Sequence, residues 1–496
     1  MRFISTRGES AVHGSAAAIM TGLAPDGGLF VPEEFPRISR EDLAALTRMT
    51  YEERAAFLLG LLFDDFSRDE IQSCVRAAYG PNFDDRAIAP VRAVTDRLFM
   101  LELWHGPTGA FKDMALQLLP RLMAAARSAA GRSDTSLILV ATSGDTGKAA
   151  LEGFRDVPGT RIVVYYPQTG VSPMQQLQMT TQQGSNVHVV AVYGNFDDAQ
   201  TGVKALFSDR ERALELADMG YSLSSANSIN YGRLAPQIVY YFSAWCDLAG
   251  QGVIAADEPV DFVVPTGNFG NILAGWYAKR MGLPVGKLVC ASNRNHILSD
   301  FLGGGRYDTR RQFYQTMSPS MDILVSSNLE RLLFEASGRN AAQVAAWMQV
   351  LSRDGSYTIP AGTLDHIRED FEGGWADERQ TRAAIAEAWR KHRILIDPHT
   401  AVAMHVQARR RRSSRAAVVV STANAYKFCG DVYAVLTGRT APADSFAQCD
   451  ALWEATGIEP PRALRALREL PVIHRQSVYP QHMGEALLRM LELAAQ

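Results

Sequence analysis

Apolar and polar positions change their periodicity along the chain. In the first part, residues 41–62 carry apolar side chains at helical spacing, which predicts a helix. These side chains are Leu43, Leu46, Phe57, Leu58, Leu61 and Leu62. A turn pattern at residues 25–28 predicts entry into a short strand. We therefore expect a mostly helical region over residues 1–95.

From about residue 98, short β-branched runs alternate with helical stretches. The expected strands are 137–140, 161–166, 187–192, 260–264, 288–291 and 416–420, and the expected helices between them are 148–154, 173–183, 197–207 and 272–281. Repetition of strand, loop and helix is typical of parallel sheets covered by helices. Apolar runs without alternation indicate strands buried on both faces. The pattern predicts an α/β fold with open parallel sheets.

Composition narrows the classes of protein that fit this pattern. The chain has 496 residues, with 50 Lys+Arg against 53 Asp+Glu and a net charge of −3. Such a balance argues against a protein that coats nucleic acid. Apolar runs stay below the about 18–20 residues of a membrane span, and the start lacks the apolar run of a secretory signal. We expect a cytoplasmic protein with no membrane partner.

Cysteines and clustered arginines give no sign of a metal site or a nucleic-acid site. The five cysteines are far apart, odd in number and without a Cys-x-x-Cys pair, so neither a disulfide framework nor a metal site is expected. Residues 409–412 are all arginine and end a helical stretch. We interpret them as a solvated helix end, because a nucleic-acid patch needs more basic neighbours and interleaved aromatics.

Three loops follow apolar strands, where ligands bind in open α/β sheets. They are 142–147, 266–271 and 421–427. The first two run into helices, so their amides can converge on an anion. An ordinary strand-to-helix turn is the alternative. Neither loop matches the Walker or Gly-x-Gly-x-x-Gly pattern. Two anion-type loops suggest a ligand with two anionic ends, or a phosphorylated cofactor with an anionic substrate.

A fourth segment supplies a reactive amine. The turn at residues 106–109 leads into a helix expected near Phe111, which puts Lys112 in the first helical turn. The helix dipole disfavours a cation there, lowers the pKa of the amine and suits a Schiff-base lysine. An exposed lysine is the alternative. Asp113 either orients Lys112 or is a favourable carboxylate at a helix start.

Residues 105–113, His-Gly-Pro-Thr-Gly-Ala-Phe-Lys-Asp, resemble the cofactor-lysine motif of the threonine synthase family, pyridoxal-phosphate enzymes of fold type II. Further blocks resemble the same family: residues 5–8, 22–29, 143–147, 225–230 with Arg233, and 267–271. Residues 320–323 and 326–328 resemble the longer subfamily of fungi and many bacteria. The chain departs from the family at Asn424-Ala425, where members have Ser-Pro or His-Pro.

The resemblance implies a fold like that of the tryptophan synthase β subunit. Two open parallel-sheet α/β domains would then follow the helical N-terminal region. A smaller domain at 130–235 would be inserted into a larger, cofactor-binding domain at 96–129 and 236–496. We expect a monomer or a homodimer.

The resemblance also implies roles for individual residues. Lys112 would be the catalytic residue and would hold pyridoxal 5′-phosphate as a Schiff base. The other cofactor-binding residues would be Gly267, Asn268, Phe269, Gly270 and Asn271 at the phosphate, Thr422 at the pyridine nitrogen, and Asp145 at the 3′-oxygen. The substrate-binding residues would be Ser143, Gly144, Thr146, Gly147, Asn227, Ser228, Asn230, Arg233, Thr108 and His105.

By this resemblance the chain would be a carbon–oxygen lyase that converts O-phospho-L-homoserine and water into L-threonine and phosphate. Another fold type II lyase, such as a threonine dehydratase, and a non-catalytic metabolite-binding homologue are the alternatives. Arg233 matches a phosphate, with a helix-surface ion pair as its alternative. His105 is either a proton donor or a structural hydrogen-bonding residue. His399 is interpreted as a helix-entry residue.

Overall fold

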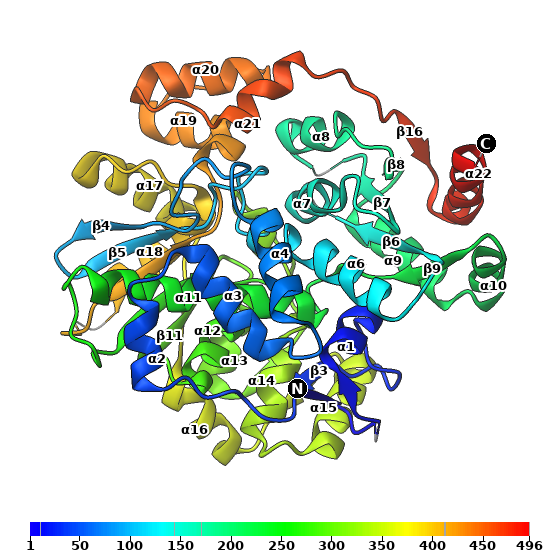
Figure 1. Cartoon of the computed structure of the whole chain (residues 1–496). Coiled ribbons are helices and arrows are strands. Elements are labelled where there is room, and N and C mark those ends of the chain that lie inside the picture. The colour runs from blue at the N-terminus through cyan, green and yellow to red at the C-terminus, as the bar shows by residue number, and fades with distance from the viewer. Residues whose placement is uncertain (10, 143, 170, 411–412, 496) are drawn as a thin grey trace.

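Parallel β-sheets organise the chain, which the computed structural model describes at residues 1–9, 11–142, 144–169, 171–410 and 413–495 (Figure 1). The larger sheet has the strand order β14-β11-β10-β15-β5-β4. Its strands are β4 (Val91–Thr95), β5 (Leu98–Glu102), β10 (Val260–Pro265), β11 (Val285–Ser292), β14 (Phe371–Trp375) and β15 (Ala417–Ser421). All pairs are parallel except β4 with β5. Each residue of β10 and β15 is buried, as expected for strands covered on both faces.

The smaller sheet has the strand order β16-β8-β7-β6-β9, and its neighbours pair in parallel. Its strands are β6 (Thr135–Ala141), β7 (Thr160–Pro167), β8 (Val187–Val192), β9 (Tyr221–Ser224) and β16 (Gln476–Val478). Helices α7 (Asp145–Phe154), α8 (Pro173–Thr180), α9 (Phe196–Ser208) and α10 (Arg210–Asp218) connect them. The expected strands and helices of this region are thus confirmed with shifts of a few residues at their ends.

The C-terminal segment returns to the smaller sheet. Figure 1 shows the chain running from α19 (Cys429–Thr437), α20 (Ser445–Thr456) and α21 (Arg462–Arg465) to β16 and α22 (Met483–Ala495) beside that sheet. Val478 and Leu487 share a buried cluster with Leu139 and Val190. The structure differs here from the predicted limits, which give this segment to the larger domain, because β16 and α22 cover an edge and an apolar face of the smaller sheet.

The N-terminal region combines helices with a small antiparallel sheet of order β2-β1-β3. Its elements are β1 (Arg2–Ser5), β2 (His13–Gly14), α1 (Ser15–Thr21), β3 (Phe30–Pro32), α2 (Arg40–Leu46), α3 (Tyr51–Leu62) and α4 (Arg68–Ala78). The single helix predicted at 41–62 is wrong, since α2 and α3 are separate. Thr50 accepts a hydrogen bond from the Glu53 amide, and the Glu53 carboxylate accepts one from the Thr50 amide at 2.8 Å. This capping box starts a new helix.

Helices cover both faces of the larger sheet. α11 (Tyr231–Gly250) and α12 (Gly270–Met281) pack together on one face with α3, while α18 (Pro398–Arg409) packs on β10 and β15. The other α-helices and strands of the described residues are α5 (Asp113–Leu116), α6 (Leu119–Ala129), α13 (Ile297–Gly304), β12 (Arg306–Asp308), α14 (Leu329–Ala336), α15 (Ala341–Asp354), β13 (Ser356–Thr358), α16 (Ala361–Asp370) and α17 (Glu378–His392). Among the described residues, no helix combines the length and the apolar character needed to cross a bilayer.

Candidate active site

The segment that carries Lys112 is fixed against the loop after β15. The Phe111 amide donates to the Thr422 carbonyl at 2.8 Å, and the Asn424 amide donates to the Gly109 carbonyl at 2.9 Å. A β-bridge joins the two segments at Ala110. Two of the four segments singled out in the sequence therefore lie side by side.

The turn before Lys112 is held by Asp113. The Asp113 carboxylate accepts bonds from the Thr108 amide at 2.9 Å and the Thr108 hydroxyl at 2.8 Å. A Cβ on Gly106 would lie 2.6 Å from the Asp113 side chain, so glycine is needed there. Asp113 thus stabilises the turn. Burial raises the pKa of this carboxyl to about 7, although both bonds from Thr108 oppose the shift.

Lys112 lies at the N-cap of α5. The residue is partly exposed, yet protein surrounds its amine. Burial lowers the pKa of the Lys112 amine to about 8, and the charges of Arg233 and Lys427 act in the same direction while Asp145 opposes them. A substantial fraction of this amine is therefore neutral and nucleophilic near pH 8. The alternative of an ordinary exposed lysine does not describe this position.

The loop between β10 and α12 has the geometry of an anion cradle. Phe269 caps α12 at a φ of 61°, in the left-handed region. A Cβ on Gly267 would meet the Ser320 carbonyl oxygen at 2.7 Å. The side-chain oxygen of Asn271 accepts from the hydroxyls of Tyr240 and Tyr241 at 2.6 and 2.8 Å. Its side-chain nitrogen is buried and has no hydrogen-bond partner in the described structure. A buried donor beside a helix N-terminus suits an anionic ligand.

The loop after β6 brings Asp145 to the same place. Gly144 has a φ of 135°, and a Cβ there would lie 2.5 Å from the Gln175 side chain. The Asp145 carboxylate contacts Lys427 at 2.9 Å, Gln175 at 2.8 Å and the Ser320 hydroxyl at 3.3 Å. Burial alone would raise the pKa of Asp145, but Lys427 and Lys112 outweigh burial and hold it well below its ordinary value. Asp145 is therefore ionised.

Arg233 is a buried cation on α11. Its Nη1 donates to the Ala226 carbonyl at 3.0 Å, while its Nε is buried without a partner among the described residues. Within the same residues no carboxylate forms an ion pair with it, so the alternative of a surface ion pair is wrong. Burial lowers the pKa of this guanidinium to about 10. An unpaired buried guanidinium is an attractive site for a phosphate or carboxylate.

Asn328 connects the 225–230 loop to the anion cradle. Its amide donates to the Ser228 carbonyl at 3.2 Å and to the Asn268 carbonyl at 3.0 Å. Asn230 is the N-cap of α11: it accepts from the Gly232 amide and donates to the Ile19 carbonyl, both at 2.8 Å. Both ends of this amide are used inside the protein, which favours a structural role over the predicted substrate contact.

Several predicted site residues make structural contacts. His105 Nε2 lies 2.8 Å from the Glu102 carboxylate, and the ring stacks on Trp104. This geometry supports the structural alternative for His105. The Gly147 amide donates to the Thr142 hydroxyl at 2.8 Å. Thr422 is buried beside the Lys112 segment. Ser143 lies outside the described residues. The roles assigned to this set remain predictions.

Three side chains of the site are absent from the set that the sequence predicted: Lys427, Gln175 and Ser320. Lys427 lies in the loop 421–427, which follows an expected strand. A positive charge in such a loop is the sequence feature that could have identified Lys427 as a site residue. His399 is the second residue of α18, a helix-entry position as predicted, after the N-cap Asp397 and Pro398. It also accepts a bond from the Ser320 amide at 3.1 Å, and its Nδ1 lies 2.6 Å from Asp397. His399 therefore helps to position the Ser320 loop.

The loop that departs from the family pattern at Asn424-Ala425 lacks the proline of other members. Hydrogen bonds of Asn424 hold this loop instead. Its side-chain oxygen accepts from the Tyr426 amide at 2.9 Å, and its own amide is bound to Gly109.

The residues described show no group of three or more His, Cys, Asp or Glu side chains placed to hold a metal ion. All five cysteines are free and buried.

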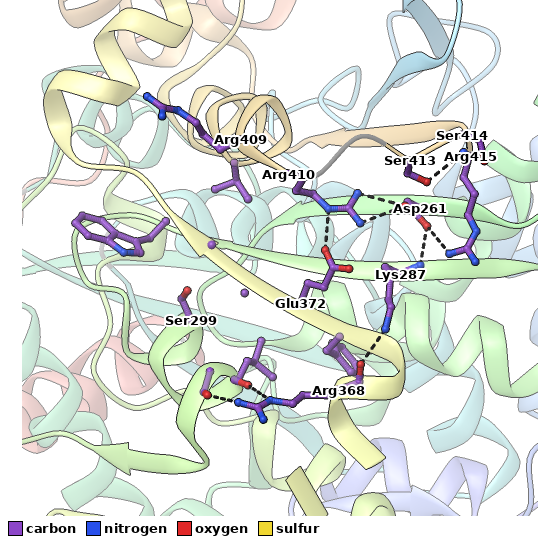
Figure 2. Close-up of a pocket in the computed structure, with 17 residues that line it drawn as sticks. Asp261, Lys287, Ser299, Arg368, Glu372, Arg409, Arg410, Ser413, Ser414 and Arg415 are labelled. Carbon is purple, nitrogen blue, oxygen red and sulfur yellow. Dashed lines mark hydrogen bonds and ion pairs between the residues drawn. The ribbon is translucent and has the colours of Figure 1, made fainter. Parts of the chain in front are cut away.

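A separate groove of about 1020 Å³ lies along β14 (Figure 2). It contains none of the predicted site residues. Arg410 bonds there to the Glu372 carboxylate at 2.8 Å and to Asp261 at 3.2 Å, and its side chain is only 12% exposed. The prediction of a solvated helix end is thus wrong for Arg410, because the carboxylates of Glu372 on β14 and Asp261 on β10 bind its guanidinium. Arg411 and Arg412 lie outside the described residues.

Comparisons with known proteins show which family the chain resembles. Residues 2–79 match the family described as "Threonine synthase N terminus", and residues 90–423 match "Pyridoxal-phosphate dependent enzyme". The human protein "Threonine synthase-like 1" is 43% identical over 421 residues, which are 83% of this chain but 56% of that protein. The chain therefore spans little more than half the length of this relative.

Other relatives match over most of their length. The threonine synthase of Pseudomonas aeruginosa is 42% identical over 435 residues, covering 86% of this chain and 89% of that protein. The crystal structure of the PLP-bound threonine synthase from Brucella melitensis has a TM-score of 0.88 and 40% identity, with all of both chains covered. Sequence and fold therefore point to the same group of proteins.

Proposed function

Because this chain belongs to the threonine synthase family of pyridoxal-phosphate-dependent enzymes, we propose that it converts O-phospho-L-homoserine and water into L-threonine and inorganic phosphate. The observation that carries the proposal is that one site contains both the enclosed amine of Lys112 and the buried guanidinium of Arg233. Lys112 offers a partly neutral amine, and Arg233 offers a guanidinium with no carboxylate partner among the described residues. The first suits a cofactor aldehyde and the second suits a substrate phosphate.

The residues present fit pyridoxal 5′-phosphate. The unpartnered side-chain amide of Asn271, the N-terminus of α12 and the close approach at Gly267 form a cradle for its phosphate. Lys112 would hold the cofactor as a Schiff base, and Thr422 and Asp145 would face the ring. When bound, the cofactor supplies the electron sink that the chemistry at Cα and Cβ requires.

The protein's own residues would hold the two ends of the substrate and move protons between them. Arg233 would bind the phosphate, and the first turn of α7, at Thr146, would bind the carboxylate. Fixing both ends orients the reacting carbons. The amine of Lys112, partly neutral near pH 8, would take and return protons at Cα and Cβ. The water that becomes the threonine hydroxyl must enter after phosphate has left.

Two alternatives make different demands on the site. A threonine dehydratase has no use for a buried unpaired guanidinium, and a non-catalytic homologue has no use for an enclosed amine of lowered pKa. The expected cytoplasmic location and the monomer or homodimer belong to this proposal. The substrate partner is a small phosphorylated amino acid.

Phosphate release tests the proposal directly. The purified chain, loaded with pyridoxal phosphate, should release inorganic phosphate and form L-threonine in equal amounts from O-phospho-L-homoserine. Ammonia release from L-serine or L-threonine, without phosphate release from phosphohomoserine, would favour the dehydratase. A protein that stays colourless after addition of the cofactor would contradict the assignment of pyridoxal phosphate.

A further inference from the structure

A second lysine is buried inside the site. The Lys427 side chain has no exposed surface, and its ammonium donates to the Thr108 carbonyl at 2.9 Å. It also lies 3.3 Å from the Gln178 side-chain oxygen and 2.9 Å from the Asp145 carboxylate. Thr108 belongs to the turn that leads to Lys112. Lys427 therefore touches the Lys112 turn and the predicted substrate loop at the same time.

The Lys427–Asp145 pair joins parts of the molecule that are distant in sequence. Lys427 follows β15 of the larger sheet, whereas Asp145 begins α7 beside the smaller sheet. Gln175 on α8 and Ser320 complete the surroundings of the Asp145 carboxylate. Because both charges are buried, each needs the other: removing one leaves an uncompensated charge inside the protein.

The charged groups that face Lys112 come from different elements: Asp145 from α7, Arg233 from α11 and Lys427 from the loop after β15. Asp113, its neighbour in sequence, is directed to Thr108. Asp145 favours a protonated amine at Lys112, while Lys427 and Arg233 oppose this. The protonation of the Lys112 amine thus depends on how far the positive charge of Lys427 compensates the negative charge of Asp145.

We propose that Lys427 is a positioning residue of this active site: its buried ammonium holds and neutralises the Asp145 carboxylate, fixes the turn that carries Lys112, and so keeps the Lys112 amine available as a nucleophile. The inference rests on the proposed function, in which Lys112 binds pyridoxal phosphate. It assigns a role to a residue outside the set that the sequence predicted.

The experiment follows the attachment of the cofactor. The full-length chain, freed of cofactor by dialysis, is mixed with pyridoxal phosphate over a range of pH, and the rate of appearance of the bound cofactor's visible colour is recorded. Lys427→Met should move the midpoint of this pH profile to higher pH by about one unit. At a fixed pH below the midpoint, the cofactor should therefore attach roughly tenfold more slowly. Lys427→Arg, which keeps the charge, should stay near the unmodified chain.

The double variant Lys427→Met/Asp145→Asn separates charge from structure. Removing both charges should return the midpoint toward that of the unmodified chain. The matched control is Lys148→Met, which removes another buried lysine that pairs with a carboxylate, Glu152, at 3.1 Å on the same helix as Asp145. This control should leave the midpoint unchanged.

Distinct outcomes overturn the inference. An unshifted Lys427→Met midpoint, or an equal shift in Lys148→Met, would show that the charge of Lys427 has no part in the state of Lys112. If Lys427→Met does not fold, the other two variants decide. A midpoint that stays shifted in Lys427→Met/Asp145→Asn, or one that is shifted in Lys427→Arg, overturns the inference in the same way. If the unmodified chain never binds the cofactor, the proposed function itself fails, a result distinguishable from all of these.

Discussion

The amide of Phe111 and the carbonyl of Thr422 form a 2.8 Å hydrogen bond that ties the residue before Lys112 to the loop after β15. The bond involves only backbone atoms, as does the neighbouring bond from Asn424 to Gly109. The position of the Lys112 backbone is therefore independent of the lysine side chain. A substitution at Lys112 can remove chemistry while the frame of the site persists.

Lys112→Ala should consequently fold normally and lose activity. We expect phosphate release from O-phospho-L-homoserine to fall by more than about a thousandfold, since the amine that would hold the cofactor and move protons is gone. The unfolding temperature and far-ultraviolet circular dichroism should remain close to those of the unmodified chain. Retained phosphate release in Lys112→Ala would contradict the catalytic assignment.

Arg233→Met should weaken substrate binding without destabilising the fold. Removing a charged hydrogen-bonding group costs about 1.5–3 kcal/mol of binding, or roughly 10–150-fold in KM. The free energy of unfolding should hold or rise, because no carboxylate in the described structure loses a partner and a buried charge disappears.

Arg54→Met is the matched control for this prediction. Arg54 is buried and lies 2.6 Å from Asp247, so its loss should cost about 3–5 kcal/mol of stability and leave KM unchanged. Steady-state kinetics and urea unfolding of both variants provide the comparison. A stability loss in Arg233→Met as large as that in Arg54→Met would mean that Arg233 is a structural cation.

Local patterns in the sequence predicted the strands of the two sheets and the helices between them. This was possible because each strand or helix shows its own short-range periodicity of apolar residues. The break between α2 and α3 was also encoded locally, in Thr50 and Glu53, but the apolar spacing ran through it. The pairing of β16 with β8 depends on contacts across most of the chain. The local sequence at Gln476–Val478 therefore could not predict which sheet those residues join.

The sequence indicated the segments that meet at the candidate site, but not the contacts between their side chains. Protein encloses the Lys112 amine and the Arg233 guanidinium is buried, an arrangement that would suit a cofactor lysine and an anion-binding arginine. The pairing of Lys427 with Asp145 could not be read from either residue alone, since it exists only where a loop of one sheet meets a helix of the other. The use of Asn230 as a helix cap likewise depends on the backbone around it.

His188 should make the protein sensitive to mild acid. Burial lowers the pKa of this imidazole on β8 to about 4, with Arg161 and His474 adding to the effect. The unfolded chain takes up the same proton near pH 6.5. Between these values the unfolded state binds more protons, so the free energy of unfolding falls as the pH falls from about 6.5 to 4.

His188→Gln removes this titration, and the fall in stability over that pH range should shrink by about 1–2 kcal/mol, given the partial exposure of the side chain. Urea unfolding at pH 4.5, 5.5 and 7 measures the difference. His482→Gln, at an exposed histidine near the C-terminal end of the chain, serves as the control. Parallel pH dependence in the unmodified chain and His188→Gln would exclude His188 as the cause.

Gly267→Ala should disturb the anion cradle. The new Cβ would lie 2.7 Å from the Ser320 carbonyl oxygen, a distance that forces the backbone of one loop to move. Ser320 also contacts Asp145 and receives support from His399, so the displacement would reach the site. We expect the affinity for pyridoxal phosphate to fall about 10- to 100-fold, the range that a 1.4–2.8 kcal/mol loss produces.

Gly303→Ala gives the opposite result and tests whether crowding is the cause. Gly303 lies within α13, and beyond its chain neighbours and the helix's own backbone no described atom lies within 4 Å of a Cβ placed there. Alanine should therefore stabilise the helix by about 0.5–1 kcal/mol and leave cofactor affinity unchanged. Fluorescence titration with pyridoxal phosphate and thermal unfolding of both variants measure the contrast. If Gly267→Ala binds the cofactor as tightly as Gly303→Ala does, the loop between β10 and α12 does not form the phosphate cradle, and the proposed orientation of the cofactor is wrong.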